Sequence, residues 1–148
     1  MNLEQIFSLC SSLAMLGWLG LVFAPRWHIT REWLAPVIAP LIIGIVYIWL
    51  MANNFASAPA DSGFSSLAQV TALFSVPELV LAGWIHYLAF DLFVGAWEVR
   101  DAQKKEIHHL LVIPCLFVTF MAGPAGLVLY WVLKAAYRLV RGSQLENV

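Results

Sequence analysis

The chain has 148 residues, of which 61% are hydrophobic and only 11% are charged, and its formal net charge is -1 at pH 7. A soluble domain carries about 25% charged residues, so this composition, with a mean hydropathy of +0.81, indicates an integral membrane protein. The near-zero net charge gives no electrostatic basis for binding nucleic acid. The length predicts one transmembrane domain covering residues 1–148.

Four apolar segments are long enough to cross a bilayer, which takes about 20 helical residues. They cover approximately residues 6–24, 34–52, 79–97 and 110–133. Pro25 ends the first segment because proline cannot continue a helix interior, and the pair Asn53-Asn54 ends the second. We therefore expect an all-α fold, an integral membrane four-helix bundle.

The connection between the second and third spans is rich in Asn, Ser, Gly and Pro and reads as an exposed loop. Within it, residues 67–76 are apolar but too few to span, which predicts a short interfacial helix. The sequence Ser75-Val76-Pro77-Glu78 predicts a capping box at the start of the third span.

The first five residues contain no Lys or Arg. A secretory signal peptide begins with a basic region and a transit peptide is rich in Arg. The first apolar segment is therefore expected to be retained as a helix. This pattern predicts a protein of the bacterial inner membrane or an already processed organellar protein.

The basic residues divide between the two sides of a four-span topology. One side carries Arg26, Arg31, Arg100, Lys104 and Lys105, and the other carries Lys134, Arg138 and Arg141. The positive-inside rule makes the larger set cytoplasmic and both termini non-cytoplasmic. The C-terminal set opposes this orientation unless residues 135–140 lie along the interface and extend their basic side chains to water.

Asp91 stands in the middle of the third span, in an otherwise apolar run. Charged residues inside a membrane are costly, usually face a bundle interior and mark functional sites. At about 100° per residue, one helix face carries Trp84, Tyr87, Asp91, Gly95 and Glu98. This column is expected to face the interior with Asp91 hydrogen-bonded, either as a ligand-facing acid or as a structural pair member.

His86 lies about 140° away from Asp91 on the same helix, so the two do not form a dyad within that helix. Gly95 is expected to let a neighbouring backbone or a ligand approach closely. The fourth segment contains Gly123-Pro124-Ala125-Gly126. Because Pro124 removes a helix hydrogen bond, we expect a kink that borders the cavity containing Asp91.

A metal site is a weaker interpretation of the polar residues along and after the third span. Its candidate ligands are Asp91, Glu98, Asp101, His108 and His109. Carboxylates and imidazoles suit divalent ions, but their spacing across a loop is not a known motif. Cys10 and Cys115 lack metal-ligand spacing. We therefore predict no metal and no cofactor.

Several of these motifs occur together in one known family. They are Trp84-Ile85-His86-Tyr87, Phe90 to Gly95 with Trp97 and Asp101, Pro114, and Gly123 to Leu127. In this combination the chain resembles the abscisic-acid-deficient-four-like family over residues 78–130. The resemblance implies a small membrane protein connected with the conversion of violaxanthin to neoxanthin, an allenic carotenoid.

That isomerisation needs an acid at the epoxide oxygen and a base for a nearby vinylic proton. A buried Asp can remain protonated near neutral pH and a neutral His can accept a proton. The catalytic candidates are Asp91, His86 and Tyr87. The substrate-binding candidates are Trp84, Phe90, Gly95, Glu98 and Pro124.

The alternatives to an isomerase are a non-enzymatic pigment- or lipid-binding accessory subunit and a small proton-coupled transporter that uses Asp91 as a relay. The expected partners are membrane lipid and a hydrophobic pigment or isoprenoid. A homo-oligomer is a further possibility, since a second protomer can supply the group that the helix geometry keeps away from Asp91.

Overall fold

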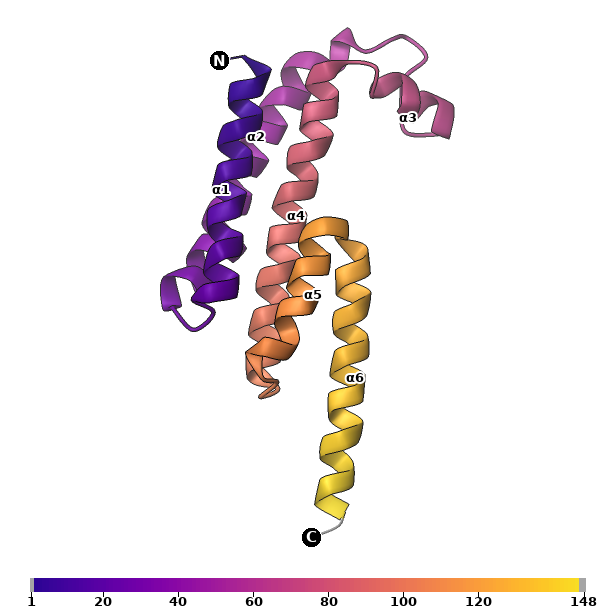
Figure 1. Ribbon diagram of the computed structural model, residues 1–148. Coiled ribbons are helices and arrows are strands. Elements are labelled where there is room, and N and C mark those ends of the chain that lie inside the picture. The colour runs from indigo at the N-terminus through magenta and orange to yellow at the C-terminus, as the bar shows by residue number, and fades with distance from the viewer. Residues whose placement is uncertain (1, 147–148) are drawn as a thin grey trace.

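The computed structural model describes residues 2–146, with the side chains of residues 2–141, and this part of the chain is all-α (Figure 1). The main helices are α1 (Leu3–Phe23), α2 (Ala39–Asn54), α4 (Pro77–Lys104), α5 (His109–Ala122) and α6 (Pro124–Glu146). Shorter elements are the π-helix η1 (Ile29–Ile38), the 3-10 turn η2 (Phe55–Ser57) and α3 (Leu67–Leu73). Among the described residues, three helical stretches are long and apolar enough to cross a membrane, and they cover 3–23, 29–57 and 77–104.

The helices of the first two predicted spans end close to the expected residues, although each begins earlier than expected. Asn2 caps α1 by accepting from the Gln5 amide at 2.8 Å, and the Gln5 side chain accepts from the Asn2 amide in return. The helix stops at Phe23, just before Pro25, which has no amide hydrogen with which to continue it. The α-helix of the second span ends at Asn54, as expected, and the 3-10 turn η2 extends the helical path to Ser57. That path begins earlier than expected, at Ile29, as the π-helix η1.

The predicted helix in the second loop forms as α3, which is shorter than expected because it ends at Leu73. The predicted capping box of the third span is wrong. The Ser75 hydroxyl donates to the Ala72 carbonyl at 2.7 Å, so it serves the preceding turn rather than α4. Val76 occupies the cap position without a side-chain hydrogen bond, and Pro77 starts the helix. Proline suits this position because its missing amide would be unpaired there anyway.

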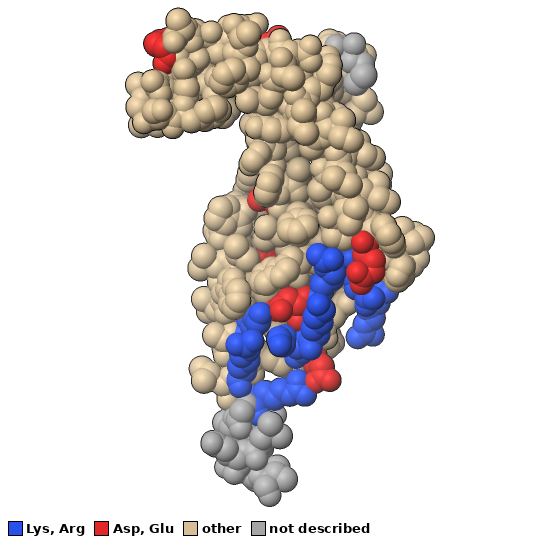
Figure 2. Space-filling model, turned by 180° about the vertical axis from the view of Figure 1, so that it is seen from behind, with Lys and Arg blue, Asp and Glu red and all other residues tan. Residues whose placement is uncertain are grey.

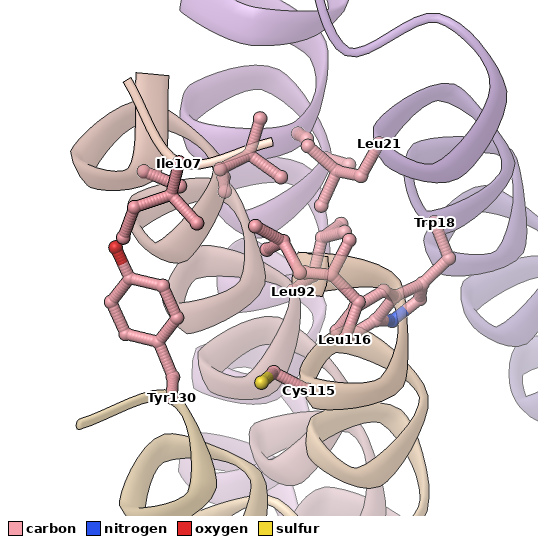
Figure 3. Packing of buried hydrophobic residues seen from close by; sticks show 13 residues of the cluster. Trp18, Leu21, Leu92, Ile107, Cys115, Leu116 and Tyr130 are labelled. Atoms are coloured by element: carbon pink, nitrogen blue, oxygen red, sulfur yellow. The ribbon is translucent and has the colours of Figure 1, made fainter. Parts of the chain in front are cut away.

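The central element is α4, which packs against α1, α2, η1, α5 and α6. Its 28 residues give a length of about 42 Å. The upper half packs on α1 and α2 through a cluster that includes Ile85 and Leu88. Figure 3 shows the lower cluster, in which Leu92 of α4, Leu116 of α5 and Trp18 of α1 lie together. Both halves of the core are thus organised around one helix.

The fourth predicted span is not one kinked helix. It divides at Gly123 into α5 and α6, which run antiparallel as a helical hairpin (Figure 1). The 14 residues of α5 extend about 21 Å, less than the hydrocarbon thickness of about 30 Å. The tip of the hairpin reaches only the middle of α4, and α6 returns to the end where α5 began (Figure 1). The predicted bend is therefore a reversal of the chain.

This reversal changes where the basic residues lie. The C-terminal half of α6 returns to the same end as the C-terminus of α4, so the two sets expected on opposite sides lie together. Figure 2 shows Lys and Arg gathered in the lower part of the molecule, whereas the upper end carries acidic side chains. The conflict between the two basic sets came from treating residues 110–133 as a complete span.

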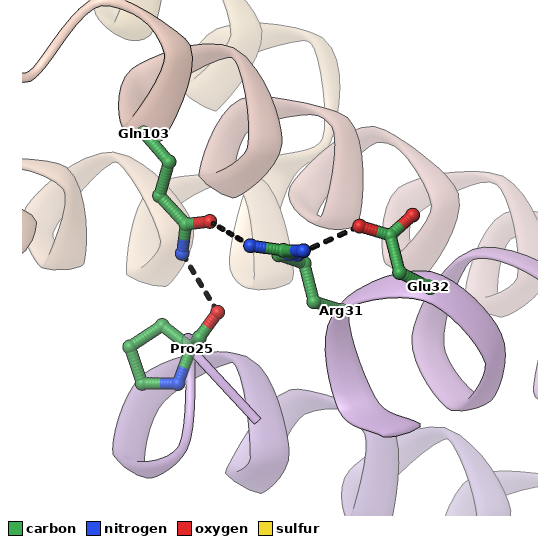
Figure 4. Close-up of polar contacts among 4 residues, drawn as sticks. All are labelled: Pro25, Arg31, Glu32 and Gln103. Atoms are coloured by element: carbon green, nitrogen blue, oxygen red, sulfur yellow. Dashed lines mark hydrogen bonds and ion pairs between the residues drawn. The ribbon is translucent and has the colours of Figure 1, made fainter. Parts of the chain in front are cut away.

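The same end is held together by polar contacts between α4 and the connection after α1 (Figure 4). The Gln103 amide donates to the Pro25 carbonyl at 2.7 Å, and Arg31 donates to the Gln103 side-chain oxygen at 3.3 Å. Arg31 also pairs with Glu32 at 2.7 Å. Gln103 thus fixes the turn that follows α1 to the C-terminal end of α4.

Candidate functional site

Asp91 lies at the tip of the α5–α6 hairpin. Its side chain is 8% exposed and faces Gly123, where a Cβ atom would stand 2.6 Å from the Asp91 Oδ1 atom. Gly123 has φ +34°, a left-handed conformation that favours glycine. The backbone conformation therefore favours glycine at this turn, and an added Cβ would also displace the Asp91 carboxyl group. The bend at Gly123 does lie beside Asp91, although it is a reversal of the chain rather than a kink, and the cavity expected between them stays a prediction.

The hydrogen bonding of Asp91 is incomplete. Its Oδ2 atom is buried and has no hydrogen-bond partner among the described residues. The Tyr87 hydroxyl, one turn earlier on α4, donates to the Phe120 carbonyl at 3.3 Å and also lies within interaction range of Asp91. A tyrosine has one hydroxyl proton, so it can serve the carbonyl or the carboxyl group but not both at once. One carboxyl oxygen thus remains available for a proton or a ligand.

Glu98 provides a second buried carboxyl group, two turns below Asp91. It is fully buried, and its Oε1 atom accepts from the Thr119 hydroxyl of α5 at 3.0 Å, while Oε2 has no partner among the described residues. Gly126 of α6 packs directly against Thr119 of α5. A Cβ at position 126 would lie 2.1 Å from the Thr119 backbone nitrogen, so the absence of a side chain permits this close packing. The hairpin therefore delivers the hydroxyl that Glu98 binds.

Asp101 belongs to a third polar cluster, which the sequence did not predict. Its Oδ2 atom accepts from the Tyr130 hydroxyl at 2.8 Å and pairs with Lys134 Nζ at 2.6 Å. The Lys134 side chain is buried, and its ammonium group lies 4.4 Å from the ring centre of Trp131. Lys134 was expected on the opposite side of the bundle, so only the return of α6 brings the pair together.

The other predicted site residues are distributed differently. Trp84 is 44% exposed, which corrects its expected interior position, and its ring stacks between Phe7 at 5.9 Å and Tyr87 at 5.6 Å. Gly95 is buried against the Trp18 ring, which would stand 2.6 Å from a Cβ. The close approach expected at Gly95 is therefore made by an aromatic side chain of α1.

His86 faces away from Asp91, as its helical position predicts. Its ring stacks on Phe90 at 4.6 Å and meets Tyr47 of α2 edge-on at 5.5 Å. Both His86 and Phe90 are exposed on the outer surface, and Pro124 is exposed at the hairpin tip. The structure thus joins Asp91 with Tyr87 and leaves His86 on another face.

The candidate metal ligands do not converge. Among the described residues, no group of three or more His, Cys, Asp or Glu side chains is arranged to hold a metal ion. Asp101 is engaged by Lys134, and His109 Nε2 lies 3.0 Å from the Val22 carbonyl oxygen.

These features define an all-α class of protein with helices apolar and long enough to cross a membrane. Its buried carboxyl groups lie beside a helical hairpin too short to cross one. Residues 5–130 match the model of the ABA DEFICIENT 4-like family, and the chain belongs to that family. The family expected from the sequence motifs is therefore confirmed.

A curated relative is Protein ABA DEFICIENT 4, chloroplastic, of Arabidopsis thaliana. The two sequences are 25% identical over 140 residues, which cover 89% of this chain and 61% of the relative. The chain thus spans less than two thirds of that protein's length. No solved structure matches the chain.

Proposed function

We propose that this chain is an integral membrane protein that binds an epoxide-bearing carotenoid or related isoprenoid in the bilayer and isomerises it. The observation that carries the proposal is the buried Asp91 carboxyl group beside the tip of the hairpin, with one oxygen that has no hydrogen-bond partner in the described part of the chain. An ionisable residue placed within a membrane helix marks a functional site by default. Membership of the ABA DEFICIENT 4-like family supports the pigment as substrate class.

The proposed arrangement has three spans and one hairpin that enters the membrane halfway and returns. This replaces the bundle of four full spans. The positive-inside rule then places the basic end of Figure 2 on the cytoplasmic or equivalent side and the start of α1 on the opposite side. A bacterial inner membrane stays a prediction from the sequence.

In the proposed reaction Asp91 acts as both acid and base. The protonated carboxyl group gives its proton to the epoxide oxygen as the carbon–oxygen bond opens, and the resulting carboxylate removes a carbon-bound proton. The substrate gains one proton and loses one, so the product is an isomer and Asp91 returns to its starting form. Tyr87 positions the carboxyl group. His86 takes part only through a second protomer.

We propose that the pigment approaches Asp91 from the upper half of the molecule. A cleft of about 350 Å³ between the upper parts of α1 and α4 is lined by Phe7, Val80, Leu81 and Trp84. Trp84 stacks on Tyr87, which leads along the same helix face to Asp91. An apolar polyene can lie against these rings with one end group at the hairpin tip.

The test uses purified protein in lipid nanodiscs with an epoxycarotenoid, and chromatography separates substrate from isomer. Wild-type protein is expected to convert the pigment without added cofactor. Asp91→Asn should abolish conversion, and the matched control Asp61→Asn, an exposed carboxylate in the upper loop, should not. Full conversion by Asp91→Asn would contradict the proposal.

A second candidate is pigment or lipid binding without turnover, by an accessory subunit. It is favoured by an apolar groove of about 670 Å³ between α1 and α2, lined by residues such as Leu9, Ile45 and Trp49. The same nanodisc experiment separates the two, because an accessory subunit retains pigment but produces no isomer. A proton-coupled transporter would show pH-dependent flux that Asp91→Asn removes.

A further inference from the structure

A second cleft, of about 350 Å³, lies at the basic end between α6 and the connection from α4 to α5. Its charged lining consists of Lys104, Lys105, Glu106, Lys134, Arg138 and Arg141. Figure 2 shows that this end of the molecule gathers blue side chains with few red ones between them. The cleft is separate from Asp91, which lies at the other end of the hairpin.

Two of the five basic groups are neutralised within the protein. Lys134 pairs with Asp101 at 2.6 Å, and Arg141 pairs with Glu106. The remaining three are Lys104, Lys105 and Arg138, and none forms an ion pair with the side chains described for residues 2–141. The cleft therefore has a surplus of positive charge directed at one small volume.

The cleft is also held in shape. Glu106 has φ 58°, an uncommon conformation for a residue with a side chain. Such a backbone persists only where surrounding contacts fix it. Here the Glu106 carbonyl accepts from the Tyr137 hydroxyl at 2.9 Å, and the Lys105 carbonyl accepts from Arg141 at 3.5 Å. The connection carrying two of the basic residues is thereby attached to α6.

We propose that this cleft binds the phosphate group of an anionic phospholipid at the membrane surface. Lys and Arg side chains in a shared pocket recognise phosphate through charge-assisted hydrogen bonds. The cleft lies where the apolar length of α4 ends. Leu139, which follows Arg138 in α6, and Leu110, at the start of α5, are 76% and 66% exposed and offer apolar surface at the same end of the molecule. The inference rests on the membrane location proposed above and is independent of the chemistry at Asp91.

The experiment titrates delipidated full-length protein in neutral detergent with short-chain phosphatidylglycerol and follows tryptophan fluorescence. A basic residue beside an anionic lipid surface changes binding about fivefold. The double variant Lys104→Gln/Arg138→Gln should therefore raise the Kd about 25-fold. The matched control Arg26→Gln/Arg100→Gln removes the same charge from positions outside the cleft and should change the Kd less than about twofold.

Phosphatidylcholine and inorganic phosphate complete the test. We expect weak binding of phosphatidylcholine and no displacement of phosphatidylglycerol by inorganic phosphate at equal concentration. Equal weakening in both double variants would overturn the site, because diffuse charge would then explain binding. Displacement by inorganic phosphate would instead assign the cleft to a soluble phosphate compound. Pigment conversion is expected to survive in both variants, so failure here leaves the role of Asp91 unaffected.

Discussion

The two halves of α4 have the same helical geometry but differ in whether their buried side chains include carboxyl groups. Above Asp91, its buried side chains are apolar and pack on α1 and α2, with Ile85 and Leu88 at the contact. From Asp91 downward, three carboxyl groups turn inward, at Asp91, Glu98 and Asp101, and they meet α5 and α6. Polar interior positions thus occur where the hairpin provides partners or a turn, and not in the half that lacks it.

The three carboxyl groups also differ in how many partners the structure gives them. The Oδ2 atom of Asp101 has two partners, whereas Asp91 Oδ2 and Glu98 Oε2 each have none among the described residues. Burying a polar group without a hydrogen bond is costly. The two fully or nearly fully buried carboxyl groups, Asp91 and Glu98, are therefore less well compensated than Asp101 at the end of α4.

The largest expected loss of stability comes from removing the ion-pair partner of Asp101, the carboxyl group with the most partners. Lys134→Met removes the partner of Asp101 and leaves a mostly buried charge, which typically costs about 3–5 kcal/mol. We expect a clear fall in the melting temperature in detergent. The double variant Lys134→Met/Asp101→Asn should recover part of it. A single variant as stable as wild type would show that the lower half does not depend on this pair.

Gly123→Ala is expected to follow in size. A Cβ at this position displaces the end of the Asp91 side chain and opposes the left-handed backbone, and the backbone strain costs about 1–3 kcal/mol. The matched control is Gly44→Ala in α2, where a Cβ meets no atom within 4 Å. The control should leave stability unchanged or raise it slightly. Thermal melting of both variants gives the contrast, and effects of the same sign would contradict the role of the hairpin tip.

Thr119→Val should have a smaller effect, since it removes one hydrogen bond to Glu98 while keeping the shape of the side chain. Side-chain hydrogen bonds in membrane proteins contribute about 0.6 kcal/mol on average. The control is Thr71→Val, whose hydroxyl bonds a carbonyl of its own exposed helix. Chemical unfolding in detergent compares the two, and a larger loss in the control would argue against hairpin docking through Thr119.

Asp91→Asn is expected to change stability least and activity most. No cation pairs with Asp91 among the described residues, so its neutralisation strands no buried charge, and the loss should stay below about 1 kcal/mol. Asp101→Asn should destabilise the fold, because it removes the carboxylate that pairs with Lys134. From the sequence alone a small effect would be expected, since Asp101 lies near the end of the span. Melting temperature measured beside pigment conversion distinguishes these two roles. A melted Asp91→Asn protein would make Asp91 structural.

Much of the local structure could be predicted from the sequence. Pro25 and Asn54 mark helix ends because proline lacks a donor and asparagine disfavours helix continuation, and both effects act within one turn. The helical period places Asp91 and Tyr87 on one face and His86 on another. The spaced motifs around Asp91 were also enough to indicate the family, which the match over residues 5–130 confirms.

Only the tertiary structure decided what the Gly123-Pro124 step does. In sequence it is compatible with a kinked span or with a reversal, because both need glycine flexibility and a missing amide. The reversal follows from packing between distant segments, in which Gly123 closes on Asp91 and Gly126 admits Thr119. The same reversal pairs Lys134 with Asp101 and collects the basic residues at one end. Local sequence determines the faces of each helix, whereas the partners of those faces depend on contacts that no single helix contains.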